Sequence, residues 1–318
     1  MKKHYKFILG IVIGLIISGV VGYAQTVLTS KEVVYDNTNS KLSSTNVKDA
    51  IDEVNTKATK KVEEAKKECP DGYVCRVNQF ARDSWATIAA NVKAGNAGAY
   101  QVGDTKEIDM GSLGTHTVRV ANTSSCTNGE TSETACGFVV EFADIISKQR
   151  MKDSASNEGE WPSNEGGWPT SEVRTYVNGT VYNALPSDLQ NAIVETTVVS
   201  GHSSCDSDNF VSNDKLYLLS SKELYDENGA PHSVSYDTAA SETRQLDYYK
   251  NKGVTISNSR IVNYSVAKKQ YNGSNVGWLL RTAHAYDTRL FFGVGDDGSW
   301  YNYGADMISG VSPAFRIA

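Results

Sequence analysis

Apolar positions along the chain change their spacing from segment to segment, and they predict helices as well as strands. Apolar residues three and four apart predict helices at 84–94, after Thr170 or Ser171, and in the region 181–194. Short apolar or alternating runs predict strands at 105–110, 115–120, 138–142, 196–200 and 216–220, the last continued through 223–225. Together these elements indicate an α+β fold in which most strands come late in the chain.

The pattern is clearest in residues 277–318, where we expect a late antiparallel sheet. Leu290, Phe292 and Val294 alternate with Phe291 and glycines, as in a half-buried strand. Asp297-Gly298 predicts a two-residue hairpin turn with positive φ at both central positions, and residues 300–303 form the returning strand. Residues 311–317 close the chain as a third strand.

This hairpin and its flanks carry aromatic and polar residues that we expect to face outward. A rigid surface of this composition can donate and accept hydrogen bonds, as antibody paratopes do. The predicted ligand-binding residues are Tyr286, Asp287, Arg289, Phe291, Trp300, Tyr301, Asn302, Tyr303 and Asp306. The plainer alternative is an ordinary β-hairpin without a ligand.

The amino end has the order of a secretory signal. Lys2, Lys3 and Lys6 precede an uncharged apolar run at 7–21, and Gly22-Tyr23-Ala24 offers small residues at a cleavage site. Residues 1–24 are therefore a signal peptide or a retained signal-anchor, and both alternatives stay open. In either case we expect the rest of the chain to be secreted or to lie on the extracellular face of the membrane.

Residues 25–68 predict a short strand followed by a helical stalk. Asn46 is a suitable N-cap, with Asp49 at the capping-box position. Apolar residues then recur at helical spacing: Val47, Ala50, Ile51, Val54, Ala58, Val62 and Ala65. The helix either lifts the head domain, residues 69–318, off the membrane and joins copies into a homo-oligomer, or docks on its own domain.

Composition and charge restrict the classes of molecule that this protein is expected to bind. Apolar residues make up 40% of the 318 residues, enough for a core, and the net charge of −6 argues against a nucleic-acid partner. Tyrosine is abundant, with 17 residues against 8 phenylalanines. Tyrosine suits half-exposed strands as well as binding surfaces.

The cysteines fit an oxidising compartment. Cys69 and Cys75 flank a turn, and Cys126 and Cys136 bracket a polar loop, so each pair predicts a local disulfide. Cys205 is left over, either free or paired elsewhere. A zinc site is disfavoured because no histidine stands at ligand spacing from either pair.

We find no catalytic set in the sequence and expect neither enzymatic activity nor a cofactor. The histidines are scattered, and a couple between His202 and Cys205 is disfavoured because sequence neighbours rarely have the required geometry. Calcium stays open as an alternative, because the acidic loop offers hard oxygens. Those oxygens belong to Asp206, Asp208, Asn209 and Asp214.

Several segments carry a family resemblance. Residues 35–53 resemble a collar segment of phage tail proteins and of surface proteins from Gram-positive gut bacteria, which implies display. The ordered motifs at 167–178, 185–186, 216–220, 278–281 and 310–317 resemble an uncharacterised extracellular domain family of such bacteria. Its architecture is similar to the C-type-lectin-like fold of formylglycine-generating enzymes (sulfatase-modifying factor). The resemblance covers residues 75–318 and implies a lectin-like head.

Two qualifications limit what this resemblance implies. Ser312 stands where the family usually has Arg, so an ion pair made by that Arg would be absent here. Formylglycine-generating enzymes need a late cysteine pair, and this chain has no cysteine after Cys205, so the resemblance implies the fold and not that activity.

The resemblance also extends to proteins diversified by retroelements. In diversity-generating retroelement targets of similar fold the variable segment is the C-terminal end, which matches residues 287–306 in position and composition.

The sequence therefore favours a surface-displayed ligand-binding protein, an adhesin or receptor-like molecule. Its expected partner is a protein or glycan at a cell surface. A structural alternative, a stalked or pilus-like surface subunit, stays open, and an enzyme of unknown reaction is the third hypothesis.

Overall fold

The computed structural model describes residues 42–67, 77–153, 162–228, 236–257 and 260–318. The chain divides into two compact units, Met1–Arg76 and Val77–Ala318. Among the described residues, none of the helices combines the length and apolar character needed to span a membrane. The expected signal segment 1–24, the short strand near residue 34 and the pair Cys69/Cys75 lie outside the described residues.

In the first unit, helix α2 spans Val47–Lys67 and confirms that this segment is helical. Its start follows from the local sequence, because Asn46 Oδ1 accepts the Asp49 N–H at 3.0 Å, as an N-cap does. Ala50 is buried, whereas Ile51 and Val54 are 39% and 50% exposed. The described part of the apolar stripe is therefore largely open to solvent.

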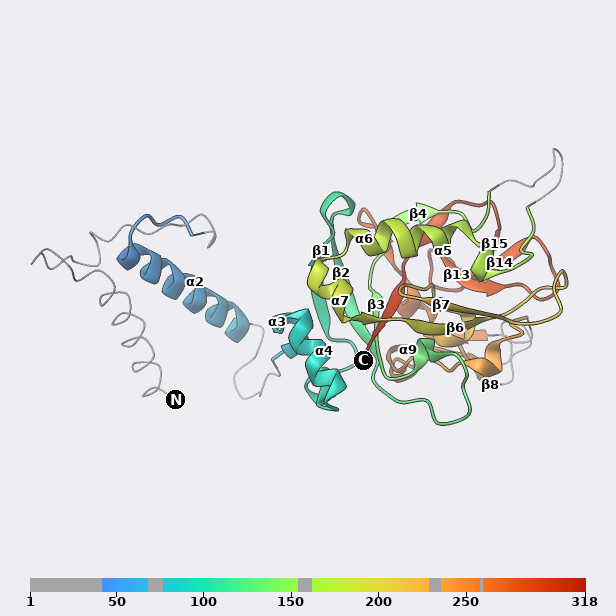
Figure 1. The fold of residues 1–318 in the computed structure, drawn as a ribbon, viewed down its shortest axis with the longest axis horizontal. Helices are drawn as coiled ribbons and strands as arrows, with labels where there is room; N and C mark the ends of the chain where they lie inside the picture. The colour runs from blue at the N-terminus through green and yellow to red at the C-terminus, as the bar shows by residue number, and fades with distance from the viewer. Residues whose placement is uncertain (1–41, 68–76, 154–161, 229–235, 258–259) are drawn as a thin grey trace, which may run out of the picture. The chain divides into compact units, whose positions relative to one another are not determined.

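The second unit is α+β and contains two five-stranded sheets (Figure 1). The first sheet has the order β1-β2-β3-β17-β5, with Thr105–Asp109, Thr115–Asn122, Phe138–Phe142, Ala314–Ile317 and Ile193–Val194. Each pair of neighbouring strands in it is antiparallel. The predicted β1–β2 hairpin is confirmed by the antiparallel pairing of its strands, and β3 is buried along its whole length, as its apolar run indicated.

The second sheet contains the late strands predicted from the sequence. Its order is β15-β14-β13-β16-β4, with Trp300–Gly304, Leu290–Val294, Trp278–Ala283, Ser309–Val311 and Ser147–Gln149. The sheet is mixed, since β13 pairs with β16 in parallel while its other pairs are antiparallel. Figure 1 shows β13–β15 on the side of this unit opposite β1 and β2.

The predicted third strand at the chain end is two strands in two sheets. β16 pairs with β13 and β4 in the second sheet, and β17 lies between β3 and β5 in the first. Ser312 and Pro313 make the crossing. Residues 309–317 therefore contribute one interior strand to each of the two sheets.

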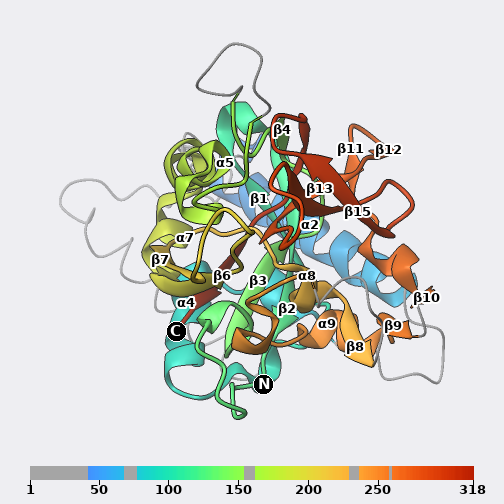
Figure 2. The same cartoon turned by 90° about the vertical axis from the view of Figure 1, so that its right-hand side faces the viewer.

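Smaller elements accompany the two sheets, and two of these groups, β11–β12 and β8–β10, are labelled in Figure 2. The additional strands are β6 Thr196–Ser200, β7 Phe210–Asp214, β8 Asp226–Asn228, β9 Thr255–Ser257, β10 Arg260–Val262, β11 Gln270–Tyr271 and β12 Ser274–Asn275. The helices are α3 Gln79–Arg82, α4 Trp85–Lys93, α5 Glu172–Tyr176, α6 Tyr182–Ala184, α7 Ser187–Ala192, α8 Ser221–Leu224 and α9 Asp247–Asn251. A π-helical turn, η5 (Val177–Val181), connects α5 to α6.

The strand predicted at residues 216–225 is wrong. Residues 216–220 are buried but make only an isolated bridge, Tyr217 to Ala314. Residues 221–224 form α8 instead, because Ser220 and Glu223 make a reciprocal capping box. That signature, a serine followed three residues later by glutamate, is readable in the sequence.

The turn between β14 and β15 also differs from the expected two-residue type. Only Gly298, with φ of 88°, has positive φ there, and the Gly298 N–H donates to the Gly295 carbonyl at 2.9 Å. Gly295 also donates to the Ser299 carbonyl at 2.7 Å. The loop is therefore residues 296–298 with a glycine in the left-handed region, a common three-residue hairpin connection.

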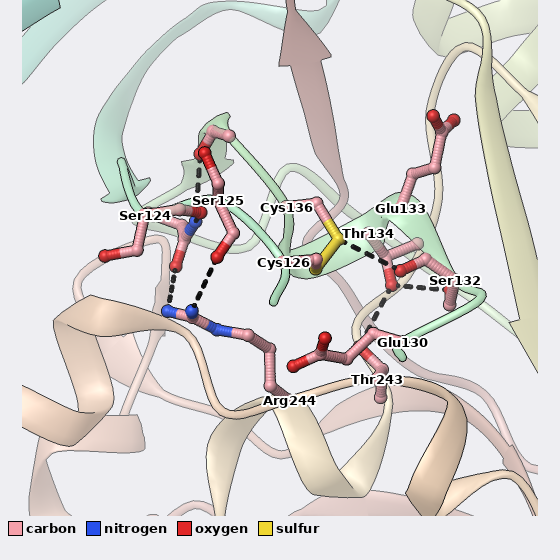
Figure 3. Close-up of a disulfide and its surroundings, with 12 residues drawn as sticks. Ser124, Ser125, Cys126, Glu130, Ser132, Glu133, Thr134, Cys136, Thr243 and Arg244 are labelled. Atoms are coloured by element: carbon pink, nitrogen blue, oxygen red, sulfur yellow. Dashed lines mark hydrogen bonds between the residues drawn. A yellow bond between two sulfur atoms is a disulfide. The ribbon is translucent and has the colours of Figure 1, made fainter. Parts of the chain in front are cut away.

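The predicted Cys126–Cys136 disulfide is present, with a Cα–Cα distance of 5.0 Å. Its loop docks on the segment before α9, where Arg244 donates to the Ser125 carbonyl at 3.2 Å (Figure 3). The end of the loop reaches into the core, and the Ser132 hydroxyl accepts the Val199 N–H at 3.0 Å. The disulfide thus stabilises a loop that connects α9, β6 and the core.

Candidate functional site

Residues of the family motifs are engaged in holding the scaffold together. Trp168 Nε1 donates to Asp214 Oδ2 at 2.9 Å, and Arg174 Nε donates to Asp214 Oδ1 at 2.7 Å. Asn178 contacts the segment that follows Asp214, because its Oδ1 accepts the N–H groups of Lys215 and Leu216 at 3.0 Å each. The side chains of Trp168, Arg174 and Asn178 in the motif at 167–178 therefore stabilise the fold around Asp214.

Arg281, the last residue of the Trp-Leu-Leu-Arg motif, forms a fully buried ion pair with Glu223. Its two terminal nitrogens lie 2.7 and 2.6 Å from the two carboxylate oxygens. Arg281 also donates to the Leu218 carbonyl at 2.8 Å. Desolvation raises the pKa of Glu223, but Arg281 more than reverses this and holds the pKa below its ordinary value. The pair ties β13 to α8.

Ser312, the departure from the family pattern, belongs to a second buried network. Its hydroxyl accepts from Lys269 Nζ at 2.9 Å, and Lys269 also binds Glu141 at 2.7 Å. Arg119 pairs with the other oxygen of Glu141 at 2.8 Å. Burial lowers the pKa of Lys269 to about 8, although Glu141 acts in the opposite direction. In this chain Arg119 and Lys269 both compensate the charge of Glu141, so this carboxylate has cationic partners even though position 312 is a serine.

The predicted ligand residues of the hairpin divide between its two faces. Because side chains alternate along a strand, Phe291, Tyr301 and Tyr303 share one face, and Trp300 and Asn302 share the other. The expectation that Phe291 and Tyr303 face outward is wrong, since they are 0% and 8% exposed and belong to the core. Both faces of β14 are covered, which the alternating pattern did not reveal.

Tyr303 has a specific place in this core. Its ring covers two glycines: a Cβ at Gly293 would lie 2.4 Å from the ring, and one at Gly277 would lie 1.8 Å from the hydroxyl. The hydroxyl donates to the Val294 carbonyl at 3.1 Å. The absence of side chains at these glycines makes room for the tyrosine, which therefore supports the sheet.

The remaining predicted residues reach solvent. Tyr286 is 70% exposed and Tyr301 is 52% exposed. Asp287 and Arg289 form an exposed ion pair at 2.9 Å, and the hydrogen bond from Arg289 holds the pKa of Asp287 below its ordinary value. We define the terminal surface as Tyr286, Asp287, Arg289, Trp300, Tyr301, Asn302 and Asp306, all of which are exposed or partly exposed.

The loop that carries Tyr286 is fixed from below by two buried side chains that the sequence did not single out. Asn164 Nδ2 donates to the carbonyls of Asp287 and Leu290 at 3.0 and 2.8 Å. His284 Nδ1 lies 3.2 and 3.0 Å from the backbone nitrogens of Tyr286 and Asp287, so it accepts both N–H groups. Exposed side chains on this loop therefore stand on an ordered backbone.

His284 also joins a row of aromatic rings beneath the terminal surface. It stacks on Tyr236 at 4.7 Å and on Phe292 at 5.4 Å between ring centroids. Tyr286 meets Tyr236 edge-on at 5.3 Å, and Trp300 lies 6.3 Å from Phe292. The two ends of the row, Tyr286 and Trp300, belong to the terminal surface.

The other end of the hairpin is fixed as well. Tyr225, fully buried, donates its hydroxyl to the Gly298 carbonyl at 2.8 Å. A Cβ at Gly298 would lie 2.3 Å from the Tyr264 carbonyl oxygen, so the turn packs closely on that backbone. The hairpin is therefore held at both ends.

The calcium alternative finds no support in the geometry of the acidic loop. Asp206 Oδ2 accepts the Gly166 N–H at 3.0 Å, Asn209 hydrogen-bonds Thr238, and Asp214 binds Trp168 and Arg174. No group of three or more His, Cys, Asp or Glu suited to a metal occurs in the part of the chain that the structure describes. The candidate oxygens thus serve different local contacts.

Two other features, a candidate His/Cys couple and a pocket, include no residue of the terminal surface. His202 Nδ1 lies 2.7 Å from the Ser203 carbonyl oxygen, and Cys205 is a free, exposed thiol. A pocket of 460 Å³ lies at the β1 edge of the first sheet. It is lined by Asn78, Ala81, Thr105, Lys106, Glu107 and Thr117.

Comparison with known proteins places much of the chain in a family. Residues 143–318 match the family described as "Domain of unknown function (DUF6273)", and no curated protein or solved structure matches the chain. The match covers the whole second sheet and the terminal surface but begins after β3, so three strands of the first sheet precede it. Because the match spans more than half of the chain, this protein belongs to the DUF6273 family.

Proposed function

We propose that this protein is displayed outside the cytoplasm, secreted or membrane-tethered, and binds a protein or glycan through the terminal surface. The observation that carries the proposal is the contrast in exposure between side chains of residues 284–306 and the residues packed beneath them. Tyr286 and Tyr301 are more than half exposed, while Asn164, Phe291 and Phe292 beneath them are fully buried. Rigid, exposed tyrosines supply contact area at low cost in conformational entropy.

The polar members of the surface complement these rings. Arg289 and Asp287 neutralise each other at 2.9 Å and can both turn hydrogen-bonding atoms toward a ligand. Trp300, partly exposed, adds apolar area next to Asn302 on the other face of the strand. Such a mixture suits a protein epitope or a sugar, whose C–H faces pack on aromatic rings while its hydroxyls meet polar groups.

A screen of the full-length protein against glycans and cell-surface proteins, with and without EDTA, tests this proposal. We expect the double variant Tyr286→Ala/Tyr301→Ala to lose at least tenfold in affinity for any ligand found. Val211→Ala is the matched control, because Val211 is 67% exposed on β7, outside the terminal surface. Equal loss in the control, or none in the double variant, would contradict the proposed site; loss of binding in EDTA would revive the calcium alternative.

We also propose the finer architecture implied by the resemblance, a C-type-lectin-like head diversified by a retroelement. Support comes from the late strands of the second sheet, which present the exposed members of residues 287–306 on a buried frame. Diversification would be tolerated at Tyr301 but not at Phe291 or Tyr303. Sequencing of the flanking DNA decides this, because the idea requires a near-copy of the segment and a reverse transcriptase gene.

A structural role for the stalk is a second proposal, favoured by the exposure of Ile51 and Val54 on α2. Apolar residues at helical spacing that face solvent in one chain are buried when helices associate. Sedimentation of the full-length protein should therefore show an oligomer that Ile51→Lys/Val54→Lys dissociates. A monomer in the unsubstituted protein would remove this proposal.

A further inference from the structure

Strand β15 is an edge of the second sheet, and its sequence lacks the usual protection of an edge. Its five residues, Trp-Tyr-Asn-Tyr-Gly, include neither a charge nor a proline. Natural edge strands are usually blunted by lysine, proline, bulges or a covering segment, because an open edge is a template for pairing. The register between β14 and β15 is continuous, without a bulge.

The register shows which backbone groups of β15 point away from the sheet. Gly295 donates to Ser299 and Ala305 donates to Arg289, and these hydrogen-bonded positions recur at every second residue of an antiparallel pair. Tyr301 and Tyr303 therefore exchange hydrogen bonds with β14, and the N–H and C=O groups of Trp300 and Asn302 point outward. Within the described part of the chain these outward groups have no hydrogen-bond partner.

Charges at the two ends of β15 restrict what can pair with it. Asp296 and Asp297 are exposed beside the turn, where Lys268 supplies one positive charge, and Asp306 follows the strand at the other end. Near Asp306, Arg289 is already paired with Asp287, and Lys152, whose N–H donates to the Ala305 carbonyl, interacts with the acidic groups of Glu165 and Asp206. Each end of the edge thus keeps a net negative charge.

The same charges oppose pairing of β15 with a second copy of itself. The Gly304 carbonyl already accepts the Met307 N–H, so an antiparallel pair that avoids Gly304 and uses both Trp300 and Asn302 places Trp300 opposite Asn302 of the other copy. That register brings the Asp296-Asp297 turn of each copy toward Asp306 of the other at both ends of the pair. Like charges that meet across adjacent strands are destabilising.

We propose that β15 receives an extended segment of a partner protein by strand addition, and that this segment carries a basic residue at each end. The main-chain groups of Trp300 and Asn302 supply the hydrogen bonds, and Tyr301 and Trp300 contact alternate side chains of the added strand. Recognition by strand addition takes affinity from the main chain and specificity from such side-chain contacts. This inference rests on the proposed function and narrows its ligand to a peptide.

Panning a random heptapeptide phage library on the full-length protein tests the inference. Asn302→Pro removes an outward N–H that the sheet does not use, and Val211→Ala, on exposed β7 outside the terminal surface, is the control. We expect enriched peptides with β-branched residues between lysines or arginines. Their affinity should fall at least tenfold on Asn302→Pro and stay within twofold on Val211→Ala.

A second measurement guards against misfolding of the proline variant. An enriched peptide N-methylated at the residues that face β15 should lose at least tenfold in affinity for the unsubstituted protein. Strand addition is overturned if methylated peptides bind equally well, if no peptide is enriched, or if the enriched peptides are acidic. If a ligand depends on Tyr286 and Tyr301 but is unaffected by Asn302→Pro, the proposed function stands and strand addition fails.

Discussion

Two tyrosines two residues apart on the same face of β15 have different tasks. Tyr301 is 52% exposed, whereas Tyr303 is 8% exposed and lies over Gly277 and Gly293. We expect Tyr303→Ala to lower the free energy of unfolding by about 3 kcal/mol, because it empties a space next to two glycines. Tyr301→Ala should change it by less than about 0.5 kcal/mol. Urea denaturation of both variants checks this, and equal effects would contradict the division into surface and core.

The sequence could not separate these tyrosines. A period of two predicts that alternate residues share a face, but it does not reveal whether the second face is also covered. Phe291 and Phe292 point to opposite faces and are both 0% exposed. The contacts that bury Phe291 come from distant parts of the chain, which local alternation does not encode.

His284 gives the loop at Tyr286 a dependence on pH. Burial lowers the pKa of His284 below its ordinary value of 6.5, and Asp287 partly opposes this. As pH falls through 6.5, the unfolded chain takes up this proton first, so the free energy of unfolding decreases until the lowered native pKa is passed. The groups around the ring are Asp287, with its partner Arg289, and the tyrosines Tyr236 and Tyr286.

The variant His284→Phe isolates this effect, since it keeps an aromatic ring between Tyr236 and Phe292 but cannot titrate. We expect the unsubstituted protein to lose stability relative to this variant below pH 6.5, by less than about 1.4 kcal/mol per pH unit. Urea unfolding at a series of pH values checks the slope. Parallel curves for the two proteins would mean that His284 does not titrate differently on folding.

At the scale of elements, local sequence patterns correctly predicted several helices and strands whose apolar spacing is itself characteristic of the element. The β1–β2 hairpin, β3, β6 and α4 lie within two residues of the expected bounds. The error at 216–225 has a local cause, because an apolar run predicts a strand even where the capping box of Ser220 and Glu223 starts a helix. The split of the last strand could not be predicted, since it depends on two different sheets accepting β16 and β17.

The disulfide loop is an element whose contribution can be measured. Cys126 and Cys136 are 10 residues apart, so the crosslink removes about 3 kcal/mol of loop-closure entropy from the unfolded chain. We therefore expect Cys126→Ser/Cys136→Ser to lower the free energy of unfolding by about 3 kcal/mol. Urea denaturation under oxidising conditions measures this loss, and an unchanged midpoint would show that the loop is held by its other contacts alone.

At the scale of the molecule, buried ion pairs connect segments that are far apart in the sequence. Arg281 and Glu223 are both fully buried and 2.6 Å apart. We expect Arg281→Met to cost about 3–5 kcal/mol, because it leaves an uncompensated carboxylate in the core. Arg281→Met/Glu223→Leu should cost less than the sum of the two single variants. Additive losses in denaturant unfolding would indicate that the pair does not interact as the structure indicates.

The whole chain thus separates a scaffold from a surface. Trp168, Arg174 and Arg281, which carry the family resemblance, are engaged in the scaffold, and the terminal surface lies on it. Composition predicted the surface, and its exposed members Tyr286 and Tyr301 were among the expected residues. Its supports, Asn164 and His284, were missed because single polar residues in loops carry no pattern.

Site-specific photo-crosslinking tests the central claim most directly, since it works with a ligand of any identity. A benzophenone side chain would replace Tyr286, Tyr301 or, as control, Val211 in the full-length protein, which is then irradiated with host and bacterial surface material. We expect specific crosslinked species from Tyr286 and Tyr301 and none from Val211. Crosslinks from Val211 alone, or from all three positions equally, would contradict a ligand site at the terminal surface.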